Sequence, residues 1–222
     1  MLPGLDGTGK LFKQFATGLL SSLVPIICNY PSDASLGYVD LKKVADKLIP
    51  KDEPFFILGE SFSGPIAIQL ALRQSKQLKG LILVNTFLSC PRPILARGLP
   101  LMPNWLLERP PNLVFNFIVK SSEIESTARQ EVSAIVKALD VTVVRSRLES
   151  IQAIDVSREA CLVKVPVCII QSLNDNFIPK EATRRLVAAF ENSVEIEMPG
   201  NHFVLQTYPR QSAVEVAKFC SQ

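Results

Sequence analysis

Short apolar runs alternate with segments of helical periodicity along most of this 222-residue chain. Strands buried on both faces of a sheet read as nearly continuous apolar runs, and each helix that covers a parallel sheet carries one apolar side. The alternation therefore predicts an α/β fold with a mostly parallel, doubly wound sheet. We expect strands at residues 24–31, 54–61, 78–87, 165–173 and 193–200, and helices at 11–22, 38–49, 64–77, 180–191 and 208–222.

The alternation stops between residues 88 and 160. Six prolines and many bulky apolar residues open this segment, and helical patterns without a strand signal follow them. A chain of this length supports one substantial core more readily than two. We therefore predict an α/β core formed by residues 1–87 and 161–222, with a helical cap inserted at 88–160.

Charge and cysteine content exclude several classes of protein. The 24 Lys and Arg residues are scattered against 21 Asp and Glu, so no basic stripe indicates a nucleic-acid partner. No apolar run approaches the roughly 20 residues of a membrane span. Five widely spaced cysteines and one histidine predict neither a disulfide framework nor a zinc site, and we expect free thiols in the reducing cytoplasm. Lys10, Arg92 and Arg97 are interpreted as solvated charges.

The sequence GESFSG, residues 59–64, joins the predicted strand at 54–61 to the predicted helix at 64–77. A strand, a sharp turn carrying a serine and a helix form the nucleophile elbow of serine hydrolases. Small residues flank such a serine because the two backbones pass closely. This sequence has Ser63 where the usual pattern has its last glycine, and Gly64 follows one place later. Ser61 is the candidate nucleophile.

A serine hydroxyl needs a general base and an acid that orients the base. His202, the only histidine, follows the last predicted strand, and Asp175 follows the strand at 165–173. Loops after the carboxyl ends of parallel strands share one edge of the sheet, where active sites of open α/β sheets gather. Asp155 is the alternative acid, but it precedes its strand. We expect activity to rise with pH near the ordinary histidine pKa of about 6.5.

The opening stretch GLDGTGK, residues 4–10, matches about half of a phosphate-binding loop. Such a loop needs a strand before it and a hydroxyl residue directly after the lysine. Leu11 stands in the hydroxyl position, and only Met1 and Leu2 precede Pro3. A nucleotide-binding protein is therefore a less favoured alternative.

Four motifs taken in order resemble the α/β-hydrolase superfamily: the loop LPGLDGTG, the elbow GESFSG, the acid loop DNFIP and the base loop GNHF. The opening loop is also similar to the hydrolase-like part of plant phytyl ester synthases. The resemblance implies that the backbone amides of Leu5 and Phe62 form the oxyanion hole. Each such donor typically contributes ~10²–10³ in rate.

The resemblance and the candidate triad together predict a serine hydrolase that cleaves a small-molecule carboxylic ester through an acyl-enzyme on Ser61, without a cofactor or metal. Apolar cap residues, including Trp105, Leu106 and Phe115, suggest a pocket for an apolar acyl chain or a lid that faces a membrane surface. Alternatively, they only pack the cap onto the core. The motifs also fit acyl transfer on the same triad, or a non-catalytic protein on a hydrolase scaffold.

In the family that the sequence resembles, a strand before the opening loop lies between those expected at 24–31 and 54–61. Either these two strands pair directly here, or a gap separates them. Each buried backbone group left unpaired costs roughly 1–3 kcal/mol. We therefore expect the 222 residues to be a truncated form, with further apolar strand residues upstream, low thermal stability, poor solubility and weak activity.

Overall fold

Four parallel strands form the central sheet in the part of the chain that the structure describes. The computed structural model describes residues 1–73, 76–98 and 126–222. The strands pair in chain order, β1-β2-β3-β4, and all three pairings are parallel. The expected α/β class and the parallel sheet are therefore confirmed. The strands are β1 (Phe55–Glu60), β2 (Leu78–Val84), β3 (Val167–Ser172) and β4 (Ser193–Met198).

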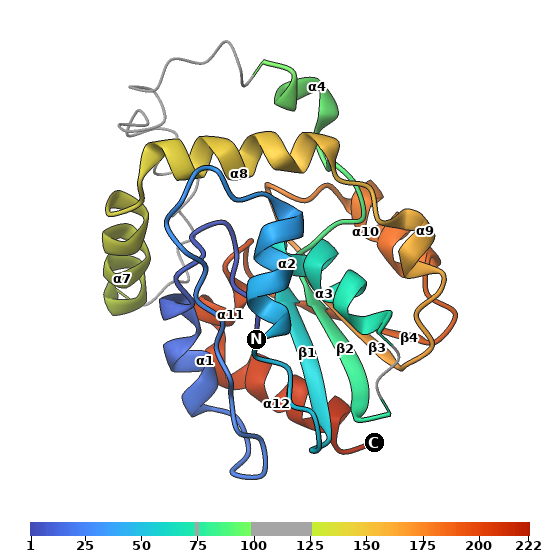
Figure 1. Cartoon of the computed structure of the whole chain (residues 1–222). Helices are drawn as coiled ribbons and strands as arrows, with labels where there is room; N and C mark the ends of the chain where they lie inside the picture. The colour runs from blue at the N-terminus through green and yellow to red at the C-terminus, as the bar shows by residue number, and fades with distance from the viewer. Residues whose placement is uncertain (74–75, 99–125) are drawn as a thin grey trace.

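Helices cover both faces of this sheet (Figure 1). One layer contains α2, α3, α9 and α10, and the opposite layer contains η1, α1, α11 and α12. The described helices are η1 (Lys10–Phe12), α1 (Lys13–Thr17), α2 (Tyr38–Asp46), η2 (Ser61–Ser63), α3 (Gly64–Ala71), α4 (Pro93–Ala96), α7 (Ser126–Lys137), α8 (Val141–Ala153), α9 (Ser157–Ala160), α10 (Lys180–Ala188), α11 (Val204–Thr207) and α12 (Pro209–Cys220).

The two layers explain why the strand sequences are apolar at nearly every position. Successive side chains of a strand point to opposite faces of a sheet. In β2, Leu81 and Leu83 belong to the core under α2 and α3, whereas Ile82 and Val84 belong to the core over α1 and α12. All four side chains are buried. The continuous apolar runs therefore reflect a sheet that has no solvent-facing side at its centre.

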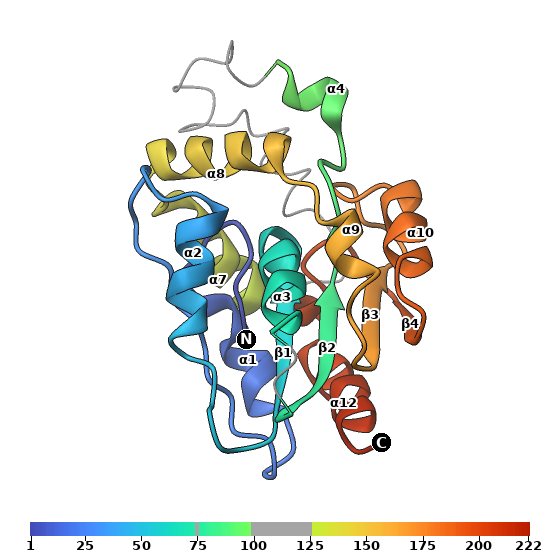
Figure 2. The same ribbon diagram turned by 45° about the vertical axis from the view of Figure 1, so that its right-hand side comes forward.

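The described part of residues 88–160 is helical and contains no strand of the sheet. Its longest helix, α8, lies across the end of the sheet toward which the arrow of β2 points (Figure 2). An isolated antiparallel bridge between Ser89 and Asp155 joins the two ends of this segment. None of the helices in the described ranges is both long enough and apolar enough to span a membrane.

The strand expected at residues 24–31 is not formed, and this expectation was wrong. The backbone N–H of Cys28 donates to Met1 (2.9 Å) and that of Tyr30 donates to Gly7 (2.8 Å), so the segment pairs with isolated residues of the opening loop. Val24 is 83% exposed. An apolar run becomes a strand only when it forms a continuous ladder of hydrogen bonds with a neighbour, and the bonds of this segment to Met1 and Gly7 are isolated.

Leu2 lies between that segment and the sheet. Its N–H donates to the carbonyl of Leu58 (2.7 Å), and its own carbonyl accepts from the N–H of Glu60 (3.1 Å). This parallel bridge at Gly59 is the one pairing found in the described chain on the edge of β1 away from β2. The segment at 24–31 and β1 therefore do not pair directly.

The turn from β1 into α3 brings two backbones into very close approach. A Cβ atom added to Gly59 would lie 2.7 Å from the Cβ of Ala67 and 2.9 Å from the carbonyl oxygen of Ser63. A Cβ added to Gly64 would overlap the side chain of Thr86. The glycines of GESFSG are thus required by packing, as the sequence pattern suggested.

We expect Gly64→Ala to destabilise the protein, because the buried Thr86 side chain, held by its hydrogen bond to Ser61, leaves no room for a methyl group. Overpacking of this kind typically costs about 1–3 kcal/mol, or roughly 2–4 °C in Tm per kcal/mol for a protein of this size. Thermal unfolding measures the change. Gly37→Ala is the matched control, since a Cβ there meets no atom within 4 Å; equal Tm values for the two variants would contradict the packing explanation.

Candidate active site

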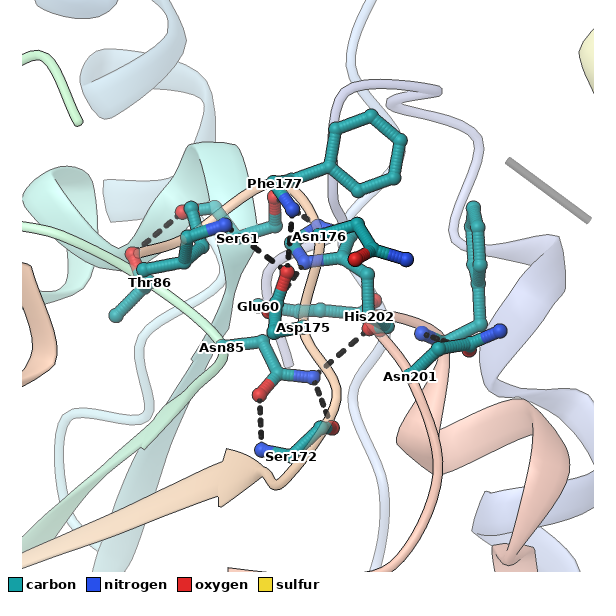
Figure 3. Close-up of polar contacts among 12 residues, drawn as sticks. Glu60, Ser61, Asn85, Thr86, Ser172, Asp175, Asn176, Phe177, Asn201 and His202 are labelled. Atoms are coloured by element: carbon teal, nitrogen blue, oxygen red, sulfur yellow. Dashed lines mark hydrogen bonds and ion pairs between the residues drawn. The ribbon is translucent and has the colours of Figure 1, made fainter. Parts of the chain in front are cut away.

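Ser61 is held in a strained backbone conformation at the carboxyl end of β1. Its φ angle is 49°, in the left-handed region that residues other than glycine seldom occupy. The hydroxyl of Thr86 donates to the carbonyl oxygen of Ser61 at 2.5 Å, which anchors the turn to the loop that follows β2 (Figure 3). The elbow therefore presents the Ser61 side chain at the edge of the sheet where the strands end.

His202 and Asp175 meet Ser61 at this edge (Figure 3). The Nε2 atom of His202 lies 2.8 Å from Oγ of Ser61, and its Nδ1 lies 2.7 Å from Oδ2 of Asp175. The other carboxylate oxygen of Asp175 accepts from the backbone N–H groups of Phe177 (2.7 Å) and Ile178 (2.9 Å). The carboxylate of Asp175 accepts a hydrogen bond from Nδ1–H of His202, and this tautomer leaves the Nε2 lone pair directed at the serine hydroxyl.

The rival carboxylate lies elsewhere. Asp155 is exposed and accepts a hydrogen bond from the backbone N–H of Ser157 (2.9 Å), just before α9 begins. Its side chain therefore serves the local turn at the end of the 88–160 segment. Of the two acids that the sequence offered, the structure brings Asp175 to His202.

Asn85 connects the histidine loop to the sheet, and no motif in the sequence identified it. Its side-chain amide donates to the carbonyl of His202 (2.9 Å) and to the hydroxyl of Ser172 (2.8 Å). Its side-chain oxygen accepts from the N–H of Ser172 (2.8 Å). Asn85 follows β2 directly and, like Ser61, has a positive φ of 44°. The signal in the sequence that could have identified Asn85 is its position, as a polar residue immediately after a buried strand.

The residues that the resemblance assigned to an oxyanion hole lie beside Ser61. A Cβ added to Gly4 would be 3.8 Å from Cβ of Ser61, so the opening loop passes against the serine. The N–H of Leu5, the next residue, makes no hydrogen bond with any residue in the described ranges. Phe62 is buried, and its ring stacks on Tyr38 at a centroid distance of 4.6 Å.

Two further expectations concern the cap segment. Trp105, Leu106 and Phe115, the candidate substrate-binding residues, lie outside the described residues. Arg92, interpreted from the sequence as a solvated charge, has a further contact. Its exposed guanidinium donates to the carbonyls of Asn176 (2.7 Å) and Phe177 (3.1 Å), and so ties the start of the 88–160 segment to the loop that carries Asp175.

Glu60, next to Ser61 in the chain, is a buried acid with 5% of its surface exposed. Burial raises its pKa to about 7. The hydrogen bond from the side-chain amide of Gln206 (3.1 Å) and the charge of His202 oppose this rise, whereas the charge of Asp6 adds to it. Glu60 therefore changes its charge close to neutral pH, near the candidate catalytic residues.

The pKa of His202 is raised above its ordinary value of 6.5. Burial lowers this pKa, but the charge and hydrogen bond of Asp175 and the charge of Glu60 together outweigh burial. The expectation of an unperturbed ionisation near 6.5 was therefore wrong. The carboxylates around the imidazole stabilise its protonated form, so the neutral form predominates only at higher pH.

A serine on a strand-turn-helix elbow, with an acid and a histidine on later loops of a parallel sheet, defines the α/β-hydrolases. The chain belongs to the hydrolase family described as serine aminopeptidase, S33, whose family model matches residues 30–198. This range includes Ser61 and Asp175. The superfamily resemblance stated from the sequence is confirmed.

Solved structures share this fold over the whole chain. A bromoperoxidase from Bacillus anthracis superposes with a TM-score of 0.81 at 11% identity, covering 100% of this chain and 90% of that one. The esterase EaEST from Exiguobacterium antarcticum has a TM-score of 0.80 at 14% identity, with coverages of 100% and 91%.

The sequence relatives align with a smaller share of each chain than the solved structures do. A protein from Pseudomonas syringae pv. syringae named "Putative carbamate hydrolase RutD" is 23% identical over 210 residues, which cover 86% of this chain and 80% of that protein. A protein of the same name from Klebsiella pneumoniae is 26% identical over 157 residues, covering 67% of this chain and 59% of that protein.

We expect Glu60→Gln to change how stability depends on pH. A carboxyl whose pKa is higher in the folded state stabilises the fold below its ordinary pKa of 4.5 and loses this contribution as pH rises through about 7. Glutamine does not titrate. The free energy of unfolding of the variant, relative to the parent protein, should therefore rise by on the order of 1–3 kcal/mol between pH 5 and pH 8.

Urea unfolding at the two pH values measures this difference. Glu53→Gln, which changes an exposed glutamate shortly before β1, is the matched control and should show no such trend. A relative stability of Glu60→Gln that stays constant between pH 5 and pH 8 would show that Glu60 keeps an ordinary ionisation.

Proposed function

We propose that this α/β-hydrolase is a serine hydrolase that cleaves carboxylic esters through an acyl-enzyme on Ser61. The observation that carries the proposal is the continuous hydrogen-bonded chain from Ser61 to His202 (2.8 Å) and from His202 to Asp175 (2.7 Å). The N–H of Leu5 beside Ser61, which has no partner among the described residues, supports it. These groups are the nucleophile, base, orienting acid and oxyanion donor that acyl transfer needs.

In the first half of the reaction, Oγ of Ser61 attacks the ester carbonyl carbon while its proton passes to Nε2 of His202. Asp175 stabilises the imidazolium that forms. The carbonyl oxygen becomes an oxyanion, which accepts hydrogen bonds from the N–H groups of Leu5 and Phe62. The intermediate then collapses, the bond to the alcohol oxygen breaks, and His202 returns the proton to the departing alcohol.

In the second half, water takes the place of the alcohol. His202 accepts a proton from water as the water oxygen attacks the acyl carbon, and the same amides stabilise the second oxyanion. The bond to Ser61 breaks, the serine oxygen recovers its proton from His202, and the carboxylic acid leaves. Every proton is carried by His202, so the sequence of steps uses no cofactor.

The similar proteins support attack on an acyl carbon without identifying the substrate. An esterase is among the solved structures with this fold, and the sequence relatives bear the name of a carbamate hydrolase. An ester and a carbamate present the same kind of carbonyl to a serine. We propose ester hydrolysis and include carbamates in the same substrate panel. We also propose that residues 88–160 act as a cap, since α8 lies across the end of the sheet (Figure 2).

We expect Ser61→Ala to abolish ester turnover and covalent labelling by a fluorophosphonate probe, while the variant keeps its Tm within a few degrees. Loss of the nucleophile in a triad enzyme costs about 10⁶ in kcat. Mass spectrometry of the labelled parent protein should locate the adduct on Ser61. Ser63→Ala removes the neighbouring hydroxyl and should still be labelled at Ser61; probe attached to the Ser61→Ala variant would refute the assignment.

We expect kcat/KM to rise with pH through one dominant ionisation above 6.5, because only neutral His202 accepts the serine proton and its pKa is raised.

Asp175→Asn should lower kcat by about 10⁴, as loss of the orienting acid does in comparable triads. The matched control is Asp155→Asn, which alters an exposed carboxylate that contacts Ser157. Similar losses in two folded variants would remove the reason for assigning Asp175 as the acid.

A further inference from the structure

Three successive carbonyl groups of the opening loop are hydrogen-bonded. The hydroxyl of Ser63 donates to the carbonyl of Pro3 through a short hydrogen bond. The N–H of Gly7 donates to the carbonyl of Gly4 at 3.1 Å. Nη1 of Arg147 donates to the carbonyl of Leu5 at 2.8 Å. The Gly4–Leu5 peptide group carries the N–H of Leu5. Its own carbonyl and the carbonyls of the peptide groups before and after it are therefore anchored, whereas the N–H of Leu5 has no partner among the described residues.

Arg147 reaches this loop from α8, which belongs to the proposed cap. Only 3% of the residue is exposed. Its Nη2 donates to the carbonyl of Pro31 at 3.1 Å, and its guanidinium carbon lies 5.9 Å from the centre of the Tyr30 ring. Gly7 makes room for the group, since a Cβ there would lie 2.7 Å from Cζ of Arg147. The guanidinium is thus enclosed between the cap, the opening loop and the 30–31 segment.

Ser63 anchors the other side of the loop from the elbow. Because its hydroxyl donates to Pro3, it accepts from the hydroxyl of Tyr30, whose oxygen lies 2.8 Å away. Tyr30 therefore contacts both anchors, through its hydroxyl on Ser63 and its ring beneath Arg147. The replacement of the usual elbow glycine by Ser63 has a structural use here.

A buried guanidinium is costly unless its donors are satisfied and its charge is balanced. Two of its N–H groups meet carbonyls of two different loops in the fork geometry that lysine cannot reproduce. Asp6, next to Leu5, stabilises the charge of Arg147 electrostatically. Burial of this charge therefore favours one placement of the opening loop relative to α8.

We propose that Arg147 is a positioning residue for the oxyanion hole. From the cap it holds the carbonyl of Leu5, and so fixes the orientation of the Leu5 N–H before substrate binds. This inference rests on the proposed function. An oxyanion donor is effective because it needs no reorganisation when charge develops. The hole is then complete only while α8 is docked on the core.

The test compares Arg147→Lys, Arg147→Ala and Ser63→Ala with the parent protein. Hydrolysis of p-nitrophenyl butyrate gives kcat and KM, and an alkyl trifluoromethyl ketone, which forms an oxyanion on the serine, gives an inhibition constant. We expect Arg147→Lys to lower kcat by about 10–100-fold with KM within about twofold, and to weaken ketone inhibition by a similar factor. Millimolar guanidinium should partly restore kcat of Arg147→Ala, and Ser63→Ala should show a smaller loss of the same kind.

Arg145→Lys is the matched control, because Arg145 lies on the same helix and its side chain pairs with Glu149 of that helix (3.9 Å). Should Arg147→Ala fail to fold, Arg147→Lys decides. Hydrogen–deuterium exchange of the peptide covering residues 3–9 gives a readout that needs no activity, and we expect faster exchange there in Arg147→Lys with no change in α12.

The outcomes separate the two proposals. An inert, unlabelled parent protein would refute the proposed function, while faster loop exchange in Arg147→Lys would still show the anchor. An active parent protein with unchanged kcat, ketone inhibition and loop exchange in a folded Arg147→Lys variant would overturn the role of Arg147 alone.

Discussion

The reversal of the backbone at Ser61 is the constraint on which the rest of the site depends. β1 ends and α3 begins within a few residues, so the two backbones are in contact at Gly59 and Gly64, where a side chain would collide with Ala67 or Thr86. The positive φ of Ser61 is an unfavourable conformation that persists because this packing leaves no other. In return, the serine hydroxyl is presented to His202 at 2.8 Å.

Polar residues at the ends of neighbouring strands hold the loops that meet the elbow. Thr86 and Asn85 follow β2, and they bond the backbone of Ser61 and of His202 respectively. Asn85 also pairs with Ser172 at the end of β3. Because parallel strands end at one edge, a single layer of hydrogen bonds can position loops that are far apart in the chain. The candidate catalytic geometry thus derives from the sheet and its register.

Buried charges surround this layer and connect it to the helices above. Glu60 lies next to Ser61, and Arg147 reaches the opening loop from α8. Both groups are withdrawn from water, so their electrostatic effects on neighbouring atoms are stronger than at the surface. The raised pKa of His202 reflects such carboxylates, Glu60 among them. The protonation state of Glu60 acts on His202, and the docking of α8 acts on the opening loop beside Ser61.

The sequence by itself determined the elements whose signal is local. A continuous apolar run identified each of β1 to β3, and the chain order of Ser61, Asp175 and His202 placed three polar groups on loops that a parallel sheet must bring to one edge. The sequence could not determine whether residues 24–31 form a strand, because that depends on another extended segment pairing with them along their length. It also did not indicate Asn85 or Arg147, whose partners His202 and Leu5 are 117 and 142 residues away. Only the tertiary structure decides such contacts, since a hydrogen bond depends on distance in space, which a local sequence pattern does not encode.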